Sequence, residues 1–248
     1  MTLPVFLGPV TGVAVGDSVV VEGDEARHAV VVRRTRVGEE VVLVDGAGSA
    51  ATCSVTSTSK TSLTALVSSV SSTPPPAPHV TVVQAIPKGD RGELAVEVLT
   101  EIGVDRIVPW AAARSVGVWR GERAERSLAK WRSTARESGK QSRRPWLPEV
   151  TPVASTAEAV SLLEAADLAV VLHERASAPM SALSLDGVAS ILVVVGPEGG
   201  ITDEELEAFG AAHVVRLGES VLRTSTAGVA AVAALLSRTS RWGGQTSR

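Results

Sequence analysis

The sequence ILVVVGPEGG at residues 191–200 joins a run of β-branched and apolar residues to a glycine-rich turn. A run of this kind predicts a strand that is buried on both faces, which is typical of parallel sheets. Two further stretches have the same form: Leu168–Leu172 precedes His173-Glu174, and His213–Leu217 precedes Gly218. Glycines after such strands let a ligand approach the backbone closely. The sequence therefore predicts a parallel sheet with ligand-binding loops at the carboxyl ends of its strands.

Helical patterns alternate with these strands, which favours an α/β fold. Val80–Ile86 and Arg106–Pro109 are two further expected strands. In the helix expected over Glu93–Ile102, the apolar stripe is formed by Leu94, Val98 and Ile102. The other expected helices cover residues 121–138, Ala157–Ala166, Thr202–Phe209 and Ser225–Leu236. The helix at 202–209 begins with Thr202-x-x-Glu205, the pattern of a capping box.

The N-terminal part of the chain has a different, β-rich pattern. Val19–Val21 and Glu40–Val44 predict strands, and residues 51–57 and 62–70 predict a hairpin. Four prolines within residues 73–78 then favour a stiff, extended linker. We therefore expect a β-barrel domain at 1–72, a linker at 73–79, an α/β domain at 80–240 and a flexible tail at 241–248.

Several classes of protein are excluded by what the sequence lacks. The longest apolar run, Ile191–Val195, is far shorter than the roughly 20 residues that a membrane span requires. The N-terminal residues lack the pattern of a signal peptide, so we expect a cytoplasmic protein. A single cysteine, Cys53, and no cluster of histidines predict neither a disulfide nor a metal site. The glycine-rich motifs of P-loop and nicotinamide enzymes are also missing.

Charge is distributed unevenly along the chain. Residues 114–144 hold ten cations and three acids, a net charge of +7, against −10 for the remainder. This asymmetry predicts a site for a polyanion on an otherwise acidic protein, although a solvated helix face is the alternative. Further cations lie on the N-terminal side of the linker. These cations would form one wall of a groove for RNA, and the 114–144 segment would form the other. The candidate RNA contacts are Arg27, Arg33, Arg34, Lys88, Arg114, Arg123, Lys130 and Arg143.

Three stretches together resemble the RsmE family of SPOUT methyltransferases. They are Lys88-Gly89-Asp90 with Thr100–Val104, then Gly196–Gly200, and then Leu217-Gly218 through Leu222–Ala227. The resemblance covers nearly the whole chain. It implies S-adenosylmethionine-dependent methylation of N3 of a uridine in 16S ribosomal RNA of the small subunit. It also implies a trefoil knot, a PUA-like N-terminal barrel and a homodimer.

The same resemblance implies that the strand-end loops hold S-adenosylmethionine. The implied cofactor contacts are Leu172, His173, Glu174, Val195, Gly196, Pro197, Glu198, Gly199, Gly200, Leu217, Gly218, Val221, Leu222, Arg223, Thr224, Thr226 and Ala227.

Two residues are the candidate catalytic groups. Arg223 would stabilise negative charge on a uridine oxygen, as donors in an oxyanion hole do. Glu198 would accept the N3 proton, with His173 as the alternative base. The small, uncharged residues of Thr226–Leu236 predict that the last helix packs against a partner chain. The alternatives are an RNA-binding or ribosome-assembly factor without activity, and a SPOUT methyltransferase that acts on another RNA.

Overall fold

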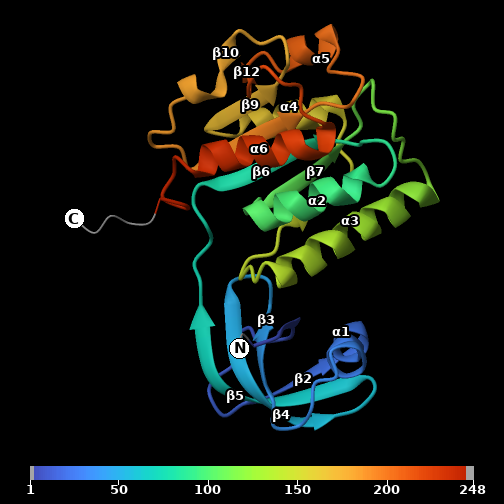
Figure 1. Cartoon of the computed structure of the whole chain (residues 1–248), viewed down its shortest axis with the longest axis vertical. Coiled ribbons are helices and arrows are strands. Elements are labelled where there is room, and N and C mark those ends of the chain that lie inside the picture. Colours follow the sequence, from blue (N-terminus) through green and yellow to red (C-terminus); the bar gives the residue numbers. More distant parts are fainter. Residues whose placement is uncertain (1–2, 244–248) are drawn as a thin grey trace. The chain divides into compact units, whose positions relative to one another are not determined.

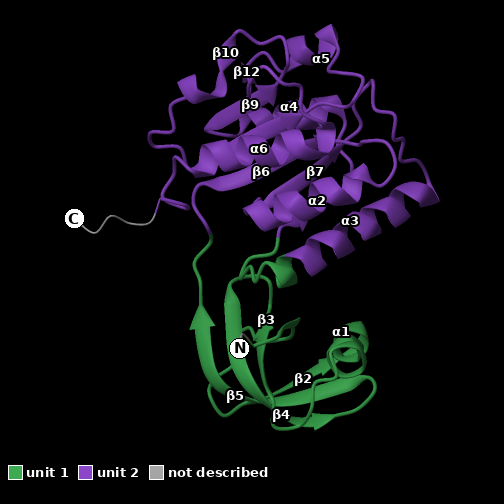
Figure 2. Cartoon of the chain, in the orientation of Figure 1, with its two compact units in different colours: residues 1–75, 139–147 green, residues 76–138, 148–248 purple. Residues whose placement is uncertain are grey.

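The computed structural model describes residues 3–243, which divide into two compact units (Figure 2). The first unit comprises the chain up to Pro75 together with Gly139–Leu147, and the second comprises Pro76–Ser138 and the chain from Pro148. The division after Pro75 falls within the expected linker. The return of residues 139–147 to the first unit departs from the continuous second domain that the sequence favours.

The first unit is built on a five-stranded sheet with the strand order β1-β3-β4-β5-β2. Its strands are β1 (Val5–Leu7), β2 (Ser18–Glu22), β3 (Glu40–Val44), β4 (Ser49–Thr58) and β5 (Ser62–Ser72). β1 and β3 are parallel, whereas all the other neighbouring strands are antiparallel. The described pairings do not join β1 to β2, so closure into a barrel does not follow from them.

Alternation of side chains explains how the first unit forms its core. In β2, Val19 and Val21 are buried while their neighbours are exposed, as expected for a strand with one face on the core. They pack with Phe6, Leu43 and Leu63 in one hydrophobic cluster. A short helix, α1 (Gly23–Arg27), continues into a π-helical turn at His28–Val32.

Residues 139–147 join the first unit through specific contacts. The Lys140 ammonium lies 3.0 Å from the Glu25 carboxylate, and the Trp146 indole donates a hydrogen bond to the carbonyl of Thr73. Leu147 packs where a side chain on Gly46 would lie. The cationic pattern alone suggests that Lys140 is exposed, but it is 7% exposed because its charge is paired with Glu25.

The second unit is built on a seven-stranded sheet with the order β10-β12-β9-β11-β6-β7-β8 (Figure 1). Every neighbouring pair is parallel. The strands are β6 (His79–Ala85), β7 (Arg106–Trp110), β8 (Glu149–Val150), β9 (Leu168–Leu172), β10 (Ala178–Pro179), β11 (Ser190–Val195) and β12 (His213–Arg216). The α/β class expected from the apolar runs is confirmed.

Helices cover both faces of this sheet. The helices are α2 (Arg91–Ile102), α3 (Glu122–Gln141), α4 (Thr156–Glu164), α5 (Asp203–Ala208) and α6 (Thr224–Leu236), with a 3-10 turn at Met180–Ala182. Buried residues of α2, α3 and α6 share one hydrophobic cluster, while those of α4 share another with Phe209 at the end of α5. The capping box expected at the start of α5 is present: the Thr202 hydroxyl and the Glu205 carboxylate each accept the other residue's backbone N–H.

The expected apolar stripe of α2 is confirmed only in part: Ile102 packs against the core cluster, but Leu94 does not lie in the core. Leu94 is 44% exposed, whereas Ala95, Val96 and Leu99 are buried. The buried face of α2 packs closely on α6, where a Cβ added to Gly228 would lie 3.2 Å from the Leu99 side chain. Leu94 is left on the surface.

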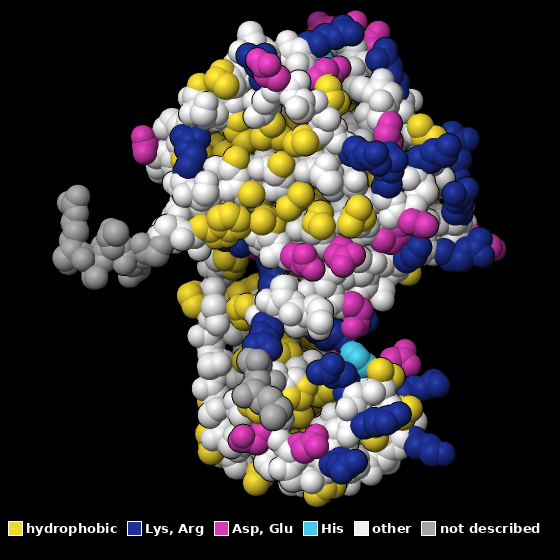
Figure 3. Space-filling model, in the orientation of Figure 1, with side chains coloured by type: hydrophobic (Ala, Val, Ile, Leu, Met, Phe, Trp, Pro, Cys, Tyr) yellow, Lys and Arg dark blue, Asp and Glu magenta, His cyan; other side chains and the backbone are white. Residues whose placement is uncertain are grey.

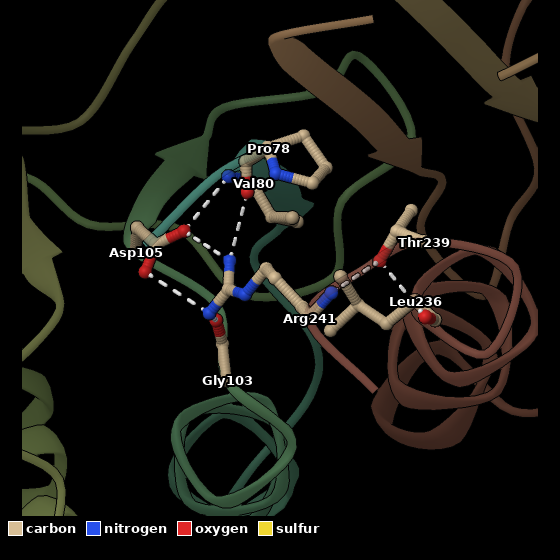
Figure 4. Close-up of polar contacts among 7 residues, drawn as sticks. All are labelled: Pro78, Val80, Gly103, Asp105, Leu236, Thr239 and Arg241. Atoms are coloured by element: carbon tan, nitrogen blue, oxygen red, sulfur yellow. Dashed lines mark hydrogen bonds and ion pairs between the residues drawn. The ribbon is translucent and has the colours of Figure 1, made fainter. Parts of the chain in front are cut away.

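The expected flexible tail is also wrong at its first residue, Arg241 (Figure 4). Its guanidinium lies 2.7 Å from the Asp105 carboxylate and donates to the carbonyls of Gly103 and Pro78. Asp105 in turn accepts a hydrogen bond from the backbone N–H of Val80. These contacts fasten the chain after α6 to the starts of β6 and β7. Within the expected tail, residues 244–248 lie outside the described residues.

Candidate functional site

The ends of β9, β11 and β12 lie side by side, because β12-β9-β11 are neighbours in a parallel sheet. Their carboxyl ends therefore meet at one edge. This arrangement brings together the loop at His173-Glu174, the loop at Gly196–Gly200 and the segment that starts at Leu217. Ligands of open parallel sheets bind at this edge.

The loop at 196–200 has little room for side chains. A Cβ on Gly196 would lie 2.7 Å from Ile201, and one on Gly199 would lie 2.9 Å from the Cβ of Arg114. Gly200 has a φ of +76°, a conformation that other residues rarely adopt. The loop is closed by a hydrogen bond from the N–H of Gly200 to the carbonyl of Pro197. Its backbone thus forms a tight cradle.

Glu205 holds the neighbouring loop in place, a role that the sequence did not predict. One carboxylate oxygen accepts the N–H of Ala113 at 2.7 Å, and the other accepts the N–H of Thr202 at 3.0 Å. Glu205 is 6% exposed. It therefore ties the loop after β7 to the start of α5, and this loop carries Arg114 to the carbonyl of Gly199 at 3.4 Å. The sequence predicted Glu205 only as part of the capping box at the start of α5.

The segment from β12 to α6 presents apolar side chains to the surface. Val221 is 79% exposed and Leu222 is 40% exposed. Arg223, which is exposed, is the N-cap residue of α6, and its carbonyl accepts hydrogen bonds from the N–H groups of Thr226 and Ala227. The arginine side chain makes no capping hydrogen bond, so it remains available to a ligand.

Gln84 lies beneath the start of α6 and was not predicted. It is 1% exposed, and its amide donates to the carbonyls of Ala85 and Thr224. Among the described residues its amide oxygen has no hydrogen-bond partner. A buried acceptor of this kind is uncommon and is often explained by a bound group or water. No sequence motif marks this glutamine.

The two candidate bases have different surroundings. Nδ1 of His173 accepts a hydrogen bond from the N–H of Arg175 at 3.2 Å. A neutral imidazole with that partner carries its hydrogen on Nε2, which then donates instead of accepting. Glu198 accepts the N–H of Lys88 at 3.3 Å and lies 4.0 Å from the guanidinium of Arg91. The geometry therefore favours Glu198 as the group that accepts a proton.

Comparison with known proteins identifies the family. Residues 74–236 match the model of an RNA methyltransferase domain, and residues 21–68 match that of an RNA methyltransferase PUA domain. Ribosomal RNA small subunit methyltransferase E of Mycobacterium bovis is 45% identical, covering 92% of this chain and 89% of that protein. This chain belongs to the ribosomal RNA small subunit methyltransferase E family. The Bacillus subtilis member is 32% identical over 87% of this chain and 88% of its own.

A solved structure supports the same assignment. The small subunit methyltransferase E of Neisseria gonorrhoeae, bound to S-adenosylmethionine, has 28% identity and a TM-score of 0.86, covering 95% of this chain and 98% of that chain. The PUA-like first unit and the parallel-sheet methyltransferase unit are therefore confirmed.

The candidate RNA contacts of this methyltransferase E chain are divided between its units. Arg27, Arg33 and Arg34 are exposed on the first unit, and Arg143 belongs to that unit as well. On the second unit, Lys88, Arg114, Arg123 and Lys130 are exposed. On the face drawn in Figure 3, Lys and Arg side chains gather near the loop that precedes α3.

Lys130 differs from the other candidate contacts because it is already paired. Its ammonium lies 3.0 Å from the Glu93 carboxylate, and the hydrogen bond to Glu93 raises the pKa of Lys130 above its ordinary value. It therefore offers RNA less charge than Arg123 does.

Residues 3–243 of this methyltransferase E chain contain neither a candidate membrane span nor a metal-binding cluster. No helix in that range is long and apolar enough to cross a membrane. Within the same range, no group of three or more His, Cys, Asp or Glu side chains is placed to hold a metal ion.

Proposed function

We propose that this protein transfers a methyl group from S-adenosylmethionine to N3 of a uridine in 16S ribosomal RNA. The observation that carries the proposal is the meeting of three loops at one sheet edge, after β9, β11 and β12, in a chain of the methyltransferase E family. The S-adenosylmethionine bound to the Neisseria relative supports the choice of cofactor.

The residues of the edge fit this cofactor. The 196–200 cradle offers backbone groups where side chains would clash, and exposed Val221 and Leu222 offer apolar cover for an adenine ring. The unpartnered amide oxygen of Gln84 offers a buried acceptor beneath the same edge. Seventeen residues were expected to bind the cofactor, and all of them belong to the carboxyl ends of β9, β11 and β12, the loops that follow or the first turn of α6.

The chemistry follows from the residues around that edge. When bound, S-adenosylmethionine supplies an electrophilic methyl group. Uridine N3 carries a proton and is a poor nucleophile, so Glu198 accepts that proton as the base is held in line. Arg223 donates to a uracil oxygen, where negative charge develops as the proton leaves.

The remaining features of the proposal concern the assembly. We infer a cytoplasmic homodimer that uses the uncharged face of α6. We also propose a trefoil knot in the second unit, as the family resemblance implies. The chain crosses from β12 to α6, which packs near β6 and β11, beyond β9 in the sheet. Exposed arginines on both units bind the RNA backbone through its phosphates.

A transfer assay tests the proposal. The protein is incubated with S-adenosylmethionine labelled in the methyl group and with 16S ribosomal RNA or small ribosomal subunits. We expect label in the RNA, and loss of most of it with Glu198→Gln. RNA binding without transfer would instead indicate an assembly factor, and label in transfer RNA alone would indicate a different substrate.

A further inference from the structure

A hollow of about 640 Å³ lies beside the cofactor loops in the second unit. Its lining comes from segments that follow β6, β7 and β11, three neighbouring strands. The 196–200 loop after β11 is therefore shared: its backbone belongs to the proposed cofactor edge, and its Glu198 side chain lines the hollow. A molecule in the hollow would lie against the loop that holds the methyl donor.

The polar side chains that line the hollow are two cations and two carboxylates: Lys88, Arg91, Asp90 and Glu198. The Glu198 carboxylate is an acceptor, 4.0 Å from the Arg91 guanidinium and 3.3 Å from the backbone nitrogen of Lys88. The Arg91 side chain is 44% exposed and that of Glu198 is 26% exposed, so both can reach a ligand. Arginine and lysine side chains only donate, whereas an ionised carboxylate only accepts. The hollow thus offers the Arg91 and Lys88 side chains as donors and the Glu198 carboxylate, with that of Asp90, as acceptors.

Two apolar side chains complete the hollow. Leu94 and Val116 are 44% and 56% exposed, and both line it. Leu94 comes from the exposed side of α2, and Val116 comes from the loop after β7. Flat aromatic rings bind between apolar side chains when a base is taken out of its stack. The hollow therefore suits a ring with a polar edge.

Uracil has the complementary edge. Its O4 and O2 accept hydrogen bonds and its N3–H, which lies between them, donates one. Cytosine presents an amino donor and an unprotonated N3 instead, so it would place acceptor against acceptor at Glu198. We propose that this hollow binds the target uracil by its Watson–Crick edge and selects uridine over cytidine. This inference rests on the proposed function.

The reaction balances in this arrangement. The N3–methyl bond forms as the bond between the methyl group and the sulfonium sulfur breaks, and its electron pair stays on sulfur. The N3 proton passes to Glu198 and then to water. Arg91 and Lys88 each donate to one uracil oxygen while this happens. Each carbonyl oxygen has a second lone pair, which leaves room for the Arg223 donor of the proposed mechanism.

The chain offers a matched control pair. Arg106 and Glu149 form an ion pair of 2.9 Å at the starts of β7 and β8, the opposite edge of the sheet. Arg91→Met and Glu198→Gln are therefore compared with Arg106→Met and Glu149→Gln. All four side chains are partly or largely exposed, and thermal melting checks that each variant is folded.

The experiment measures base preference by competition binding. RNA with uridine or cytidine at the target position competes for the protein in the presence of S-adenosylhomocysteine. We expect the wild type and both controls to prefer uridine by about tenfold to a hundredfold, the range for a good two-bond base contact. Arg91→Met should lose most of that preference, and Glu198→Gln, whose amide can donate to cytosine N3, should reverse or abolish it.

The outcomes separate this inference from the proposed function. If wild-type protein methylates uridine but Arg91→Met and Glu198→Gln keep the full preference, the hollow is not the base site. Filling the hollow with Val116→Trp gives a second test: methylation should fall at least tenfold, with affinity for S-adenosylhomocysteine unchanged. If the wild type transfers no methyl group to RNA, the proposed function itself fails.

Discussion

Gly199 shows how one missing side chain shapes the proposed cofactor edge. A Cβ at this position would lie 2.9 Å from the Cβ of Arg114 and 3.0 Å from its carbonyl oxygen. Because backbone cannot move aside cheaply, Gly199→Ala should displace the 196–200 loop. We expect the affinity for S-adenosylhomocysteine, measured by calorimetry, to fall by about tenfold or more, on the scale of a lost backbone hydrogen bond to a charged group. An unchanged affinity in a folded variant would show that the cofactor does not use this loop.

Arg223 is the residue where side chain and backbone have separable roles. Its carbonyl starts α6, so Arg223→Ala leaves the helix start intact. We expect turnover to fall by about a hundredfold, the usual effect of losing one donor to a developing oxyanion, with little change in cofactor affinity. Single-turnover kinetics measures this effect, and Arg223→Lys should recover part of it. Equal turnover of the wild type and the alanine variant would exclude the role.

At the scale of elements, Asp167 joins the starts of β9 and β11. Its carboxylate accepts hydrogen bonds from the Ser190 hydroxyl and from the N–H groups of Ala189 and Ser190, and these lower the pKa of Asp167 below its ordinary value. A carboxylate whose pKa is lowered on folding stabilises the folded state at pH values above its pKa in the unfolded chain. This stabilisation is lost as the pH falls through its pKa in the folded state.

Asp167→Asn tests that contribution. The difference in free energy of unfolding between wild type and variant should be constant above about pH 5 and should shrink below about pH 4, because protonation then removes the wild type's advantage. Urea titrations at a series of pH values measure it. A difference that grows in acid would contradict the assignment.

Element types were largely predictable, whereas contacts between distant segments were not. β-branched runs such as Ile191–Val195 form the buried strands, and the capping box marked the start of α5. In α2 the apolar pattern placed Leu94 in the core, whereas the buried face carries Ala95, Val96 and Leu99, because this is the face that packs on α6 and the sheet. The partner of Lys140, Glu25, is 115 residues away, and no local pattern carries such a pairing.

In the candidate site, too, local motifs were predictable from the sequence, whereas contacts between distant segments were not. Glycine-rich turns after strands identified the edge, but the strand order that makes β12, β9 and β11 neighbours is a property of the folded sheet. Gln84 and Glu205 are positioned by contacts with Thr224 and Ala113, which lie far along the chain. Leu94 and Val116 line a hollow only because α2 and the loop after β7 meet.

At the scale of the whole molecule, α6 carries the expected dimer contact. Thr226, Ala230 and Ala234 lie on one stripe of the helix and are exposed or half-buried, and Figure 3 shows apolar side chains gathered over α6 and α2. Light scattering should give about twice the 25.6 kDa chain mass. Ala230→Arg should yield folded monomers, because a charge cannot be buried unpaired in the interface.

The test uses Ala230 and not its neighbour Ala231, because the two residues differ in burial. Ala231 is fully buried within its own unit, so an arginine there would unfold the chain instead of separating two chains. Ala211→Arg, at an exposed turn after α5, is the matched control and should remain dimeric. A wild type that is monomeric at micromolar concentration would refute the dimer.

RNA binding is also a property of the whole molecule. If about four phosphates are neutralised, the logarithm of the binding constant should fall with the logarithm of salt concentration at a slope of roughly −3 to −4. Arg123→Glu should flatten this slope more than Lys130→Glu, because Lys130 is already paired with Glu93. Filter binding over a range of salt measures both. Slopes identical to the wild type would mean that the α3 surface is only a solvated face.

The central claim is that the protein methylates N3 of a uridine in 16S ribosomal RNA. The most direct measurement is nuclease digestion and mass spectrometry of 16S RNA treated with the protein and S-adenosylmethionine. We predict 3-methyluridine at one position, absent when Glu198→Gln replaces the wild type. A methyl group on a ribose oxygen or on another base, or no methylated nucleoside from active, cofactor-bound protein, would contradict the account.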